Sequence, residues 1–198
     1  MRWVFGILVS LFLTNMVEAK YYCLIFSWDS RIPMPHKCHT FGTFVHIENG
    51  KLIEEVTLSW TPVFRWQITD RPVEGYHQSL KRTIEFALEN KWVVRAWSPL
   101  EIKRELFLEA KKQYERQDEM RYKFMDCVAR RKTKDVVNCI HCISDVVGPH
   151  KTYISYGLFA SDSVHKHFVK RGKANPVNNY EDIAKLLDID DYPIRKIK

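Results

Sequence analysis

The chain has 198 residues and a net charge of +7, with 45% hydrophobic and 28% charged residues. This length suffices for one domain with a sizeable core, and no internal repeat or low-complexity tract argues for a second. The sequence contains no phosphate-binding glycine loop, no serine-centred nucleophile elbow and no nucleic-acid motif, which argues against those classes. We expect a monomer without a nucleic-acid partner. Its basic clusters are typical of solvated faces, with an anionic surface as the alternative partner.

The first 19 residues have the pattern of a cleaved signal peptide. A short positive start is followed by an apolar run over residues 3–13, and Val17 and Ala19 are the small residues that a signal peptidase reads. The run is shorter than the roughly 20 residues needed to span a bilayer, which disfavours an uncleaved anchor. We therefore expect export to the periplasm or the medium, a domain over residues 20–172, and a basic, loosely packed tail over residues 173–198.

Strand and turn patterns begin the domain. Residues 21–27 form an aromatic and aliphatic run that is typical of a strand. Asn49 and Gly50 then separate two further strand-like runs, at residues 40–47 and 52–60. Because both turn residues tolerate the positive φ of a type I′ turn, the sequence predicts a hairpin.

Helical patterns dominate the rest of the chain. Ser98-Pro99-Leu100-Glu101 combines a capping serine, a proline at the first helical position and a glutamate at the third, which together predict a helix start. Together the patterns predict an α+β fold, a small antiparallel sheet packed by helices. The predicted elements after the hairpin are helix 75–90, strand 92–97, helix 98–118, strand 121–126, a basic loop 127–135, helix 138–147, strand 152–156, helix 161–170 and helix 180–187.

Cys139 is the candidate nucleophile. It follows Asn138, a good N-cap residue, and so occupies the first turn of the predicted helix 138–147. The unpaired N–H groups and positive dipole end at that position favour a thiolate over a thiol. The same groups can stabilise the oxyanion that forms when sulfur attacks a carbonyl. Asn138 and Cys139 are therefore the candidate oxyanion and N-cap positions.

His39 is the candidate general base, because it lies at the mouth of a predicted strand. His141 is less suited, since it lies two residues after Cys139 on the same helix and points to a different face. The alternative is that His39 is a loop histidine without a role. The odd number of cysteines, five, leaves at least one thiol outside any disulfide, which agrees with a catalytic Cys139. Otherwise, Cys23, Cys127 and Cys142 are small buried apolar groups.

Four short segments carry a family resemblance. Residues 39–45 (His-Thr-Phe-Gly-Thr-Phe-Val), 58–62 (Leu-Ser-Trp-Thr-Pro), 121–123 (Arg-Tyr-Lys) and 138–141 (Asn-Cys-Ile-His) resemble segments of uncharacterised exported bacterial proteins. More distantly, they are similar to the circularly permuted papain-like superfamily that includes lecithin-retinol acyltransferase-like enzymes. The first resemblance covers residues 39–169, and the second rests on two short motifs. The resemblance implies a papain-like fold, with Cys139 as nucleophile and His39 as base.

The residue that would orient the histidine is not fixed by the sequence. In the register set by the predicted turn, the face of His39 is shared by Leu52, Glu54, Val56, Leu58 and Trp60. Glu54 is the polar member of this set, but it lies far along the ladder. Ser59 and Thr57 lie closer, and they share the face of His39 only if a bulge shifts the strand. All three remain candidates.

The sequence therefore predicts a thiol hydrolase or acyltransferase that acts on peptides, amides or acyl esters. Two alternatives from other functional classes remain. Cys139 and Cys142 have zinc-ligand spacing, and His36, Cys38 and His39 could complete a metal site. A single cysteine pair at this spacing is common by chance, so we expect neither metal nor cofactor. The second rival is a ligand-binding module on the same scaffold without catalysis, with aromatic residues lining its groove.

Overall fold

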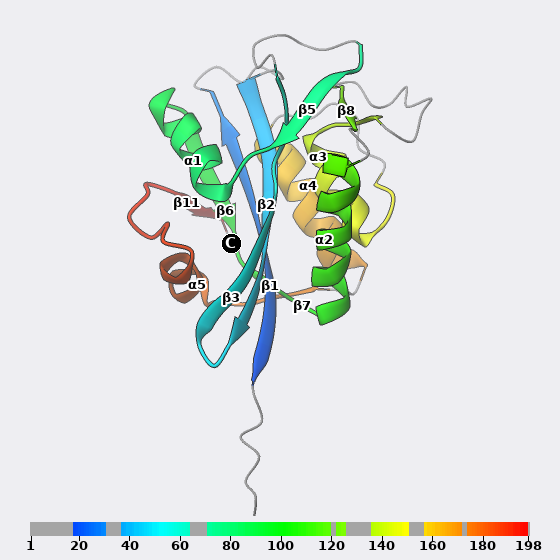
Figure 1. Cartoon of the computed structure of the whole chain (residues 1–198). Helices are drawn as coiled ribbons and strands as arrows, with labels where there is room; N and C mark the ends of the chain where they lie inside the picture. The colour runs from blue at the N-terminus through cyan, green and yellow to red at the C-terminus, as the bar shows by residue number, and fades with distance from the viewer. Residues whose placement is uncertain are drawn as a thin grey trace, which may run out of the picture.

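The computed structural model describes residues 18–30, 37–63, 71–119, 122–125, 136–150, 157–171 and 174–197. A twisted, mostly antiparallel sheet is covered by helices on both faces (Figure 1). The predicted α+β class is therefore confirmed. The predicted signal segment up to residue 17, the predicted basic loop at 127–135 and the predicted strand at 152–156 lie outside the described residues. Within the described ranges, no helix has both the length and the apolar run needed to cross a bilayer.

The main sheet has the order β10-β7-β1-β2-β3, with β6 paired to β1 and β11 paired to β6. A smaller sheet has the order β4-β5-β8-β9 and continues from the end of β3. The strands of the main sheet are β1 (Ala19–Asp29), β2 (Cys38–Glu48), β3 (Lys51–Leu58), β6 (Val93–Trp97), β7 (Leu100–Ile102), β10 (Ala174–Pro176) and β11 (Arg195–Ile197). Those of the smaller sheet are β4 (Trp60–Pro62), β5 (Val73–His77), β8 (Lys123–Phe124) and β9 (Val136–Val137).

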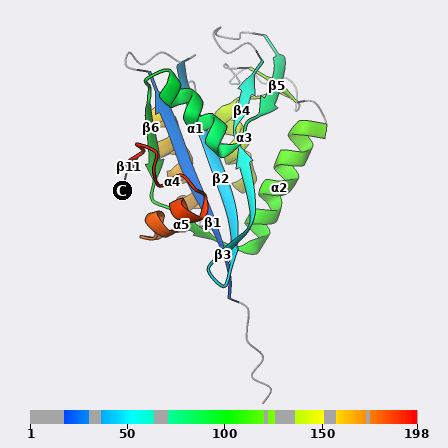
Figure 2. The same ribbon diagram turned by 60° about the vertical axis from the view of Figure 1, so that its left-hand side comes forward.

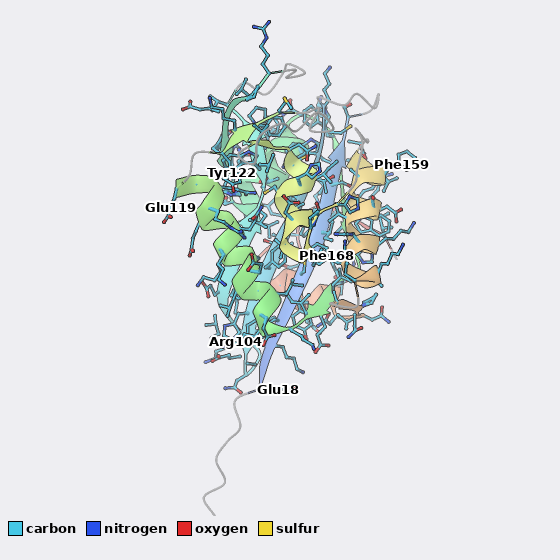
Figure 3. All side chains as sticks on the ribbon, turned by 90° about the vertical axis from the view of Figure 1, so that its right-hand side faces the viewer. Glu18, Arg104, Glu119, Tyr122, Phe159 and Phe168 are labelled. Atoms are coloured by element: carbon cyan, nitrogen blue, oxygen red, sulfur yellow. The ribbon has the colours of Figure 1, made fainter. Side chains whose placement is uncertain are left out.

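Helices form two layers, one on each face of the main sheet. Figure 2 shows α1 and α5 over one face, and Figure 3 shows α3 between α2 and α4 over the other. The helices are α1 (Leu80–Glu89), α2 (Arg104–Glu119), α3 (Cys139–Ser144), which a 3₁₀ turn (Asp145–Val147) extends, α4 (Gly157–Lys170) and α5 (Tyr180–Leu186).

Two separate apolar cores result from the alternation of side chains along the strands. On β1, Leu24 and Phe26 pack with the α1/α5 layer, whereas Cys23 and Ile25 pack with the α2/α3/α4 layer. We call these the α1-side core and the α3-side core. Every residue of β1 from Cys23 onward is buried, as expected of a strand covered on both faces.

The predicted hairpin is confirmed, and it contains a bulge. Asn49 and Gly50 have φ values of 49° and 74°, the left-handed geometry that a type I′ turn requires. The ladder begins as expected, with Ile47 opposite Leu52, but then shifts so that His46 lies opposite Glu54. One residue of β3 is therefore extra, and every side chain of β3 beyond it changes face.

Two helix predictions are wrong at their starts. Residues 73–77 form β5, and α1 begins only at Leu80, where the Ser79 hydroxyl caps it. The capping-box pattern at residues 98–101 does not start a helix either. Leu100–Ile102 is strand β7, paired on one side with β1 and on the other with β10, and α2 begins at Arg104. Long-range pairing here overrides the local helix signal.

The expectation of a loosely packed tail over residues 173–198 is also wrong. Ala174–Pro176 pairs with β7, and Arg195–Ile197 pairs in parallel with β6. Between these strands, the predicted helix near the C-terminus is confirmed as α5, whose Ile183 and Ala184 are buried in the α1-side core. The segment therefore completes both the sheet and one of its two cores.

Candidate functional site

His39 lies at the beginning of β2, where its ring is buried. The side chain is 5% exposed, and its ring centroid lies 4.6 Å from that of Trp28 and 5.6 Å from that of Phe41. Both aromatic residues belong to the α1-side core. The sequence places His39 just before the strand, whereas in the structure it is the second residue of β2, opposite Trp28 of β1, and its ring faces α1.

Ser59 holds the imidazole. Its Oγ lies 3.0 Å from Nε2 of His39, and it also accepts a hydrogen bond of 3.0 Å from the Thr83 hydroxyl on α1. Thr83 is in turn within 2.8 Å of the Ser79 carbonyl oxygen. Ser59 and Thr83 are both fully buried. A buried polar group that lacks a partner is costly, so this network fixes the ring of His39 in one orientation.

The bulge in the hairpin explains why Ser59 can reach His39. The register predicted without a bulge puts Leu58 and Trp60 on the same face of the sheet as His39. That prediction is wrong, because both side chains pack in the α3-side core. Of the three candidate orienting residues, Ser59 alone is hydrogen-bonded to the histidine in the described interactions. Thr57 bonds instead to Thr43 and to Glu55. Glu54 forms an ion pair of 2.5 Å with Lys111 of α2.

Cys139 is the first residue of α3, as predicted, and it is half-buried. Asn138 is the N-cap: its Oδ1 accepts a hydrogen bond of 2.9 Å from the backbone N–H of His141. The same oxygen lies 2.7 Å from Nδ1 of the His141 ring, so His141 is held by the cap. The half-buried thiol therefore sits in the first turn of a capped helix, next to N–H groups that have no partner within the helix.

The position of α3 is fixed by close packing against β2. A Cβ atom added to Gly42 would lie only 3.2 Å from Cγ2 of Ile143, so the helix approaches the strand as closely as a glycine allows. On the neighbouring turn, the Cys142 thiol donates to Oε1 of Gln117 at 3.1 Å. Cys142 is fully buried, and burial raises its thiol pKa well above the ordinary value. Cys142 is therefore a structural residue, and so is the buried Cys23, whose thiol pKa is also raised by burial.

The two predicted catalytic residues come from segments that meet near the beginning of β2. Ile143 of α3 contacts Gly42, which is three residues along the strand from His39. Their surroundings differ, however: Cys139 packs against the α3-side core, and the His39 ring packs against Trp28 and Phe41 of the α1-side core. The described contacts therefore place Cys139 beside the α3-side core and the His39 ring beside two aromatic residues of the α1-side core.

Within the described part of the chain, no three His, Cys, Asp or Glu side chains are grouped closely enough to hold a metal ion. His36, one of the three residues that could complete the alternative zinc site, lies outside the described residues. The fully buried Cys142 thiol, which donates to Gln117, is a poor ligand for such a site.

Sequence reasoning missed Thr83 and Trp28, the residues that support Ser59 and His39 from α1 and β1. The sequence did contain a signal for Thr83. Ser79 is a good N-cap residue, and a helix that begins after it has Thr83 in its first turn. No comparable signal existed for Trp28. Comparisons with protein-family models, with curated proteins and with solved structures found no match.

Proposed function

We propose that the protein is an exported thiol hydrolase or acyltransferase that attacks an amide or ester carbonyl through Cys139, with His39 as the general base. The observation that carries this proposal is the hydrogen bond between Ser59 and Nε2 of His39. A third polar group that orients the imidazole is typical of thiol enzymes, and the contact between Ser59 and His39 supports this role. The fold would be the permuted papain-like arrangement that the sequence motifs resemble.

The reaction would proceed through an acyl-enzyme. With Nε2 held by Ser59, Nδ1 of His39 takes the thiol proton while the Cys139 sulfur forms a bond to the substrate carbonyl carbon. Backbone N–H groups of the first turn of α3, that of Cys139 among them, stabilise the oxyanion. The imidazolium returns its proton to the leaving nitrogen or oxygen as the scissile bond breaks. Water or another acceptor then releases the acyl group by the reverse sequence, and no cofactor is required.

This chemistry requires the sulfur and Nδ1 to meet around the first residues of β2. A half-buried Cys139 leaves a route for substrate, and the packing of Ile143 on Gly42 keeps α3 at the same end of the strand as His39. The α3 dipole and N–H groups favour the thiolate before the base is engaged. Catalysis would therefore depend on both the helix start and the histidine.

The second candidate is a binding module without catalysis. It is favoured by one observation, that the His39 ring is 5% exposed and packed between aromatic rings, an environment that also suits a purely structural histidine. In that case the network of His39, Ser59 and Thr83 would serve only to join α1 to the sheet.

A fluorescent acyloxymethyl ketone, which alkylates activated cysteine thiols, separates the two candidates. The enzyme proposal expects labelling of Cys139 in the wild type, loss of labelling in Cys139→Ala, and a large decrease in His39→Ala. Cys142→Ser is the matched control, because it removes a thiol from the same helix without touching the proposed nucleophile. Labelling that persists in Cys139→Ala, or that is unchanged in His39→Ala, would favour the binding module.

A further inference from the structure

A cavity of about 580 Å³ lies beside β3, away from Cys139. One wall is the strand itself over residues 54–57, and a second wall is one face of α2, with Lys111, Tyr114 and Glu115 at helical spacing. The third side is formed by residues 77–79, which connect β5 to α1. Figure 2 shows α2 next to β3. Of its lining residues, Ser79 alone takes part in the described network that holds His39, through its carbonyl oxygen, and the proposal below does not use it.

β3 is the last strand on its side of the main sheet among the described residues. An edge strand presents backbone N–H and C=O groups that can pair with another extended chain. A groove between an edge strand and a helix is the arrangement in which proteins bind extended peptides by strand addition. The cavity therefore offers both a backbone template and a place for a side chain.

The polar groups of the cavity are mainly hydrogen-bond acceptors. Oε1 of Gln78, a residue only 7% exposed, is buried and has no hydrogen-bond partner in the described structure. Glu55 and Glu115 are exposed carboxylates at its rim, and Glu55 is oriented by the Thr57 hydroxyl, which donates to it at 2.7 Å. An unpaired buried acceptor is costly until a donor reaches it. A ligand that fits must bring N–H donors.

The charge of the cavity is negative, although the whole chain is basic. Three glutamates line it against one lysine, and that lysine, Lys111, is already paired with Glu54 at 2.5 Å. His77 adds no positive charge near neutral pH, because burial lowers its pKa to about 4 and the nearby Gln117 only partly opposes this. Its ring stacks on Tyr114, with centroids 4.2 Å apart, and forms a flat aromatic surface. Cations bind favourably over such surfaces.

We propose that this groove binds an extended peptide segment with a lysine or arginine side chain. The segment adds as a further strand to the edge of β3, and its cation enters the cavity between Glu55, Glu115 and the Tyr114 ring. The backbone pairing supplies much of the affinity, and the acidic cavity supplies the preference for a basic residue. This binding does not depend on the chemistry at Cys139.

Fluorescence anisotropy with a fluorescein-labelled acetyl-Thr-Val-Thr-Lys-Thr-Val-Thr-amide tests the proposal directly. The protein used is Cys139→Ala, so that no cleavage interferes and a failure to bind says nothing about catalysis. We expect saturable binding. The double variant Glu55→Gln, Glu115→Gln should weaken it by about tenfold, because it removes two partly exposed charge pairs with the peptide. The double variant Glu105→Gln, Glu119→Gln changes the net charge equally at exposed positions of α2 outside the groove. It should bind as the parent does.

Two further peptides separate strand addition from simple cation binding. The same peptide with glutamate in place of lysine should bind at least about tenfold more weakly, and the lysine peptide N-methylated at alternate residues should lose binding. Equal binding of the lysine and glutamate peptides would overturn the proposal. So would equal weakening by the two double variants, or competition by lysine amide at the affinity of the whole peptide.

Discussion

The hydroxyl of Ser59 lies 3.0 Å from Nε2 of His39 because a one-residue bulge interrupts the hairpin that joins their strands. Without the bulge, the ladder would turn Ser59 to the other face of the sheet. The bulge is close to the turn, between His46 and Ile47, yet it decides which residue meets the histidine at the opposite end of the strand. β-Bulges commonly re-aim side chains next to functional sites.

Replacing Ser59 with alanine should both destabilise the protein and slow the reaction of Cys139. The change leaves Nε2 of the buried His39 without its partner, at a cost of about 1–3 kcal/mol in the free energy of unfolding. Thr57→Ala is the matched control, because Thr57 lies on the same strand and bonds to Glu55 rather than to the histidine. Both variants should unfold at lower urea concentration, and only Ser59→Ala should lower the alkylation rate of Cys139. Equal rates in the two variants would mean that Ser59 does not position the base.

Asn138→Ala should remove the cap of α3. The variant loses the hydrogen bond from the His141 N–H and leaves Nδ1 of His141 without the cap oxygen, at a cost of about 0.5–2 kcal/mol. Asn138→Asp keeps a capping oxygen and should recover most of this loss in urea denaturation. A full loss in both variants would contradict the capping role.

Gly75→Ala should be far more destabilising than Gly42→Ala. A Cβ atom at position 75 would lie within 2.4 to 2.6 Å of three atoms of the Trp60 ring, which is 1% exposed and cannot move aside. At position 42 the nearest atom is the end of the Ile143 side chain, at 3.2 Å. We expect a loss of about 1–3 kcal/mol for Gly75→Ala and a clearly smaller one for Gly42→Ala, measured by thermal or urea unfolding. A larger loss of stability in Gly42→Ala than in Gly75→Ala would contradict the close packing of β5 on Trp60.

His77 should make the protein less stable as the pH falls. Its pKa is about 4 in the folded state, because of burial, and about 6.5 in the unfolded chain. The unfolded chain therefore binds the proton first, so stability is complete above pH 6.5 and is lost as the pH falls toward 4. Between pH 7 and pH 4.5 the wild type should lose about 2–3 kcal/mol more than His77→Gln does. Parallel pH profiles of the two proteins in urea denaturation would exclude this role of His77.

The sequence predicts the local elements of this fold better than it predicts their long-range pairing. The hairpin at Asn49-Gly50 and the short helix after Asn138 follow from turn and cap chemistry, which is local, and both are confirmed. Strand β7 carries a helix-start pattern, yet pairing with β1 and β10 draws it into the sheet. In the sequence, the C-terminal segment looks like a charged tail. Its two short strands form only by pairing with β7 and β6, which are distant in the sequence.

The candidate site shows the same division. Cys139 and Asn138 are local features of a helix start and are placed as expected. The partner of His39 depends on a register shift that leaves no signature in the sequence of β3, so Ser59 could be named only as one of three candidates. The support that Thr83 gives to Ser59 comes from another helix, and only the tertiary structure brings it there.

The pH dependence of Cys139 alkylation by iodoacetamide, mapped residue by residue with mass spectrometry, tests the central claim most directly. If His39 activates the thiol, Cys139 should react at pH 6–7 in the wild type, and its rate at that pH should fall at least about tenfold in His39→Ala. Cys23 and Cys142 serve as internal controls, because both are fully buried with raised thiol pKa values and should stay unmodified in the folded protein. A Cys139 that reacts as slowly as these two in the wild type, or at the same rate with and without His39, would contradict the account.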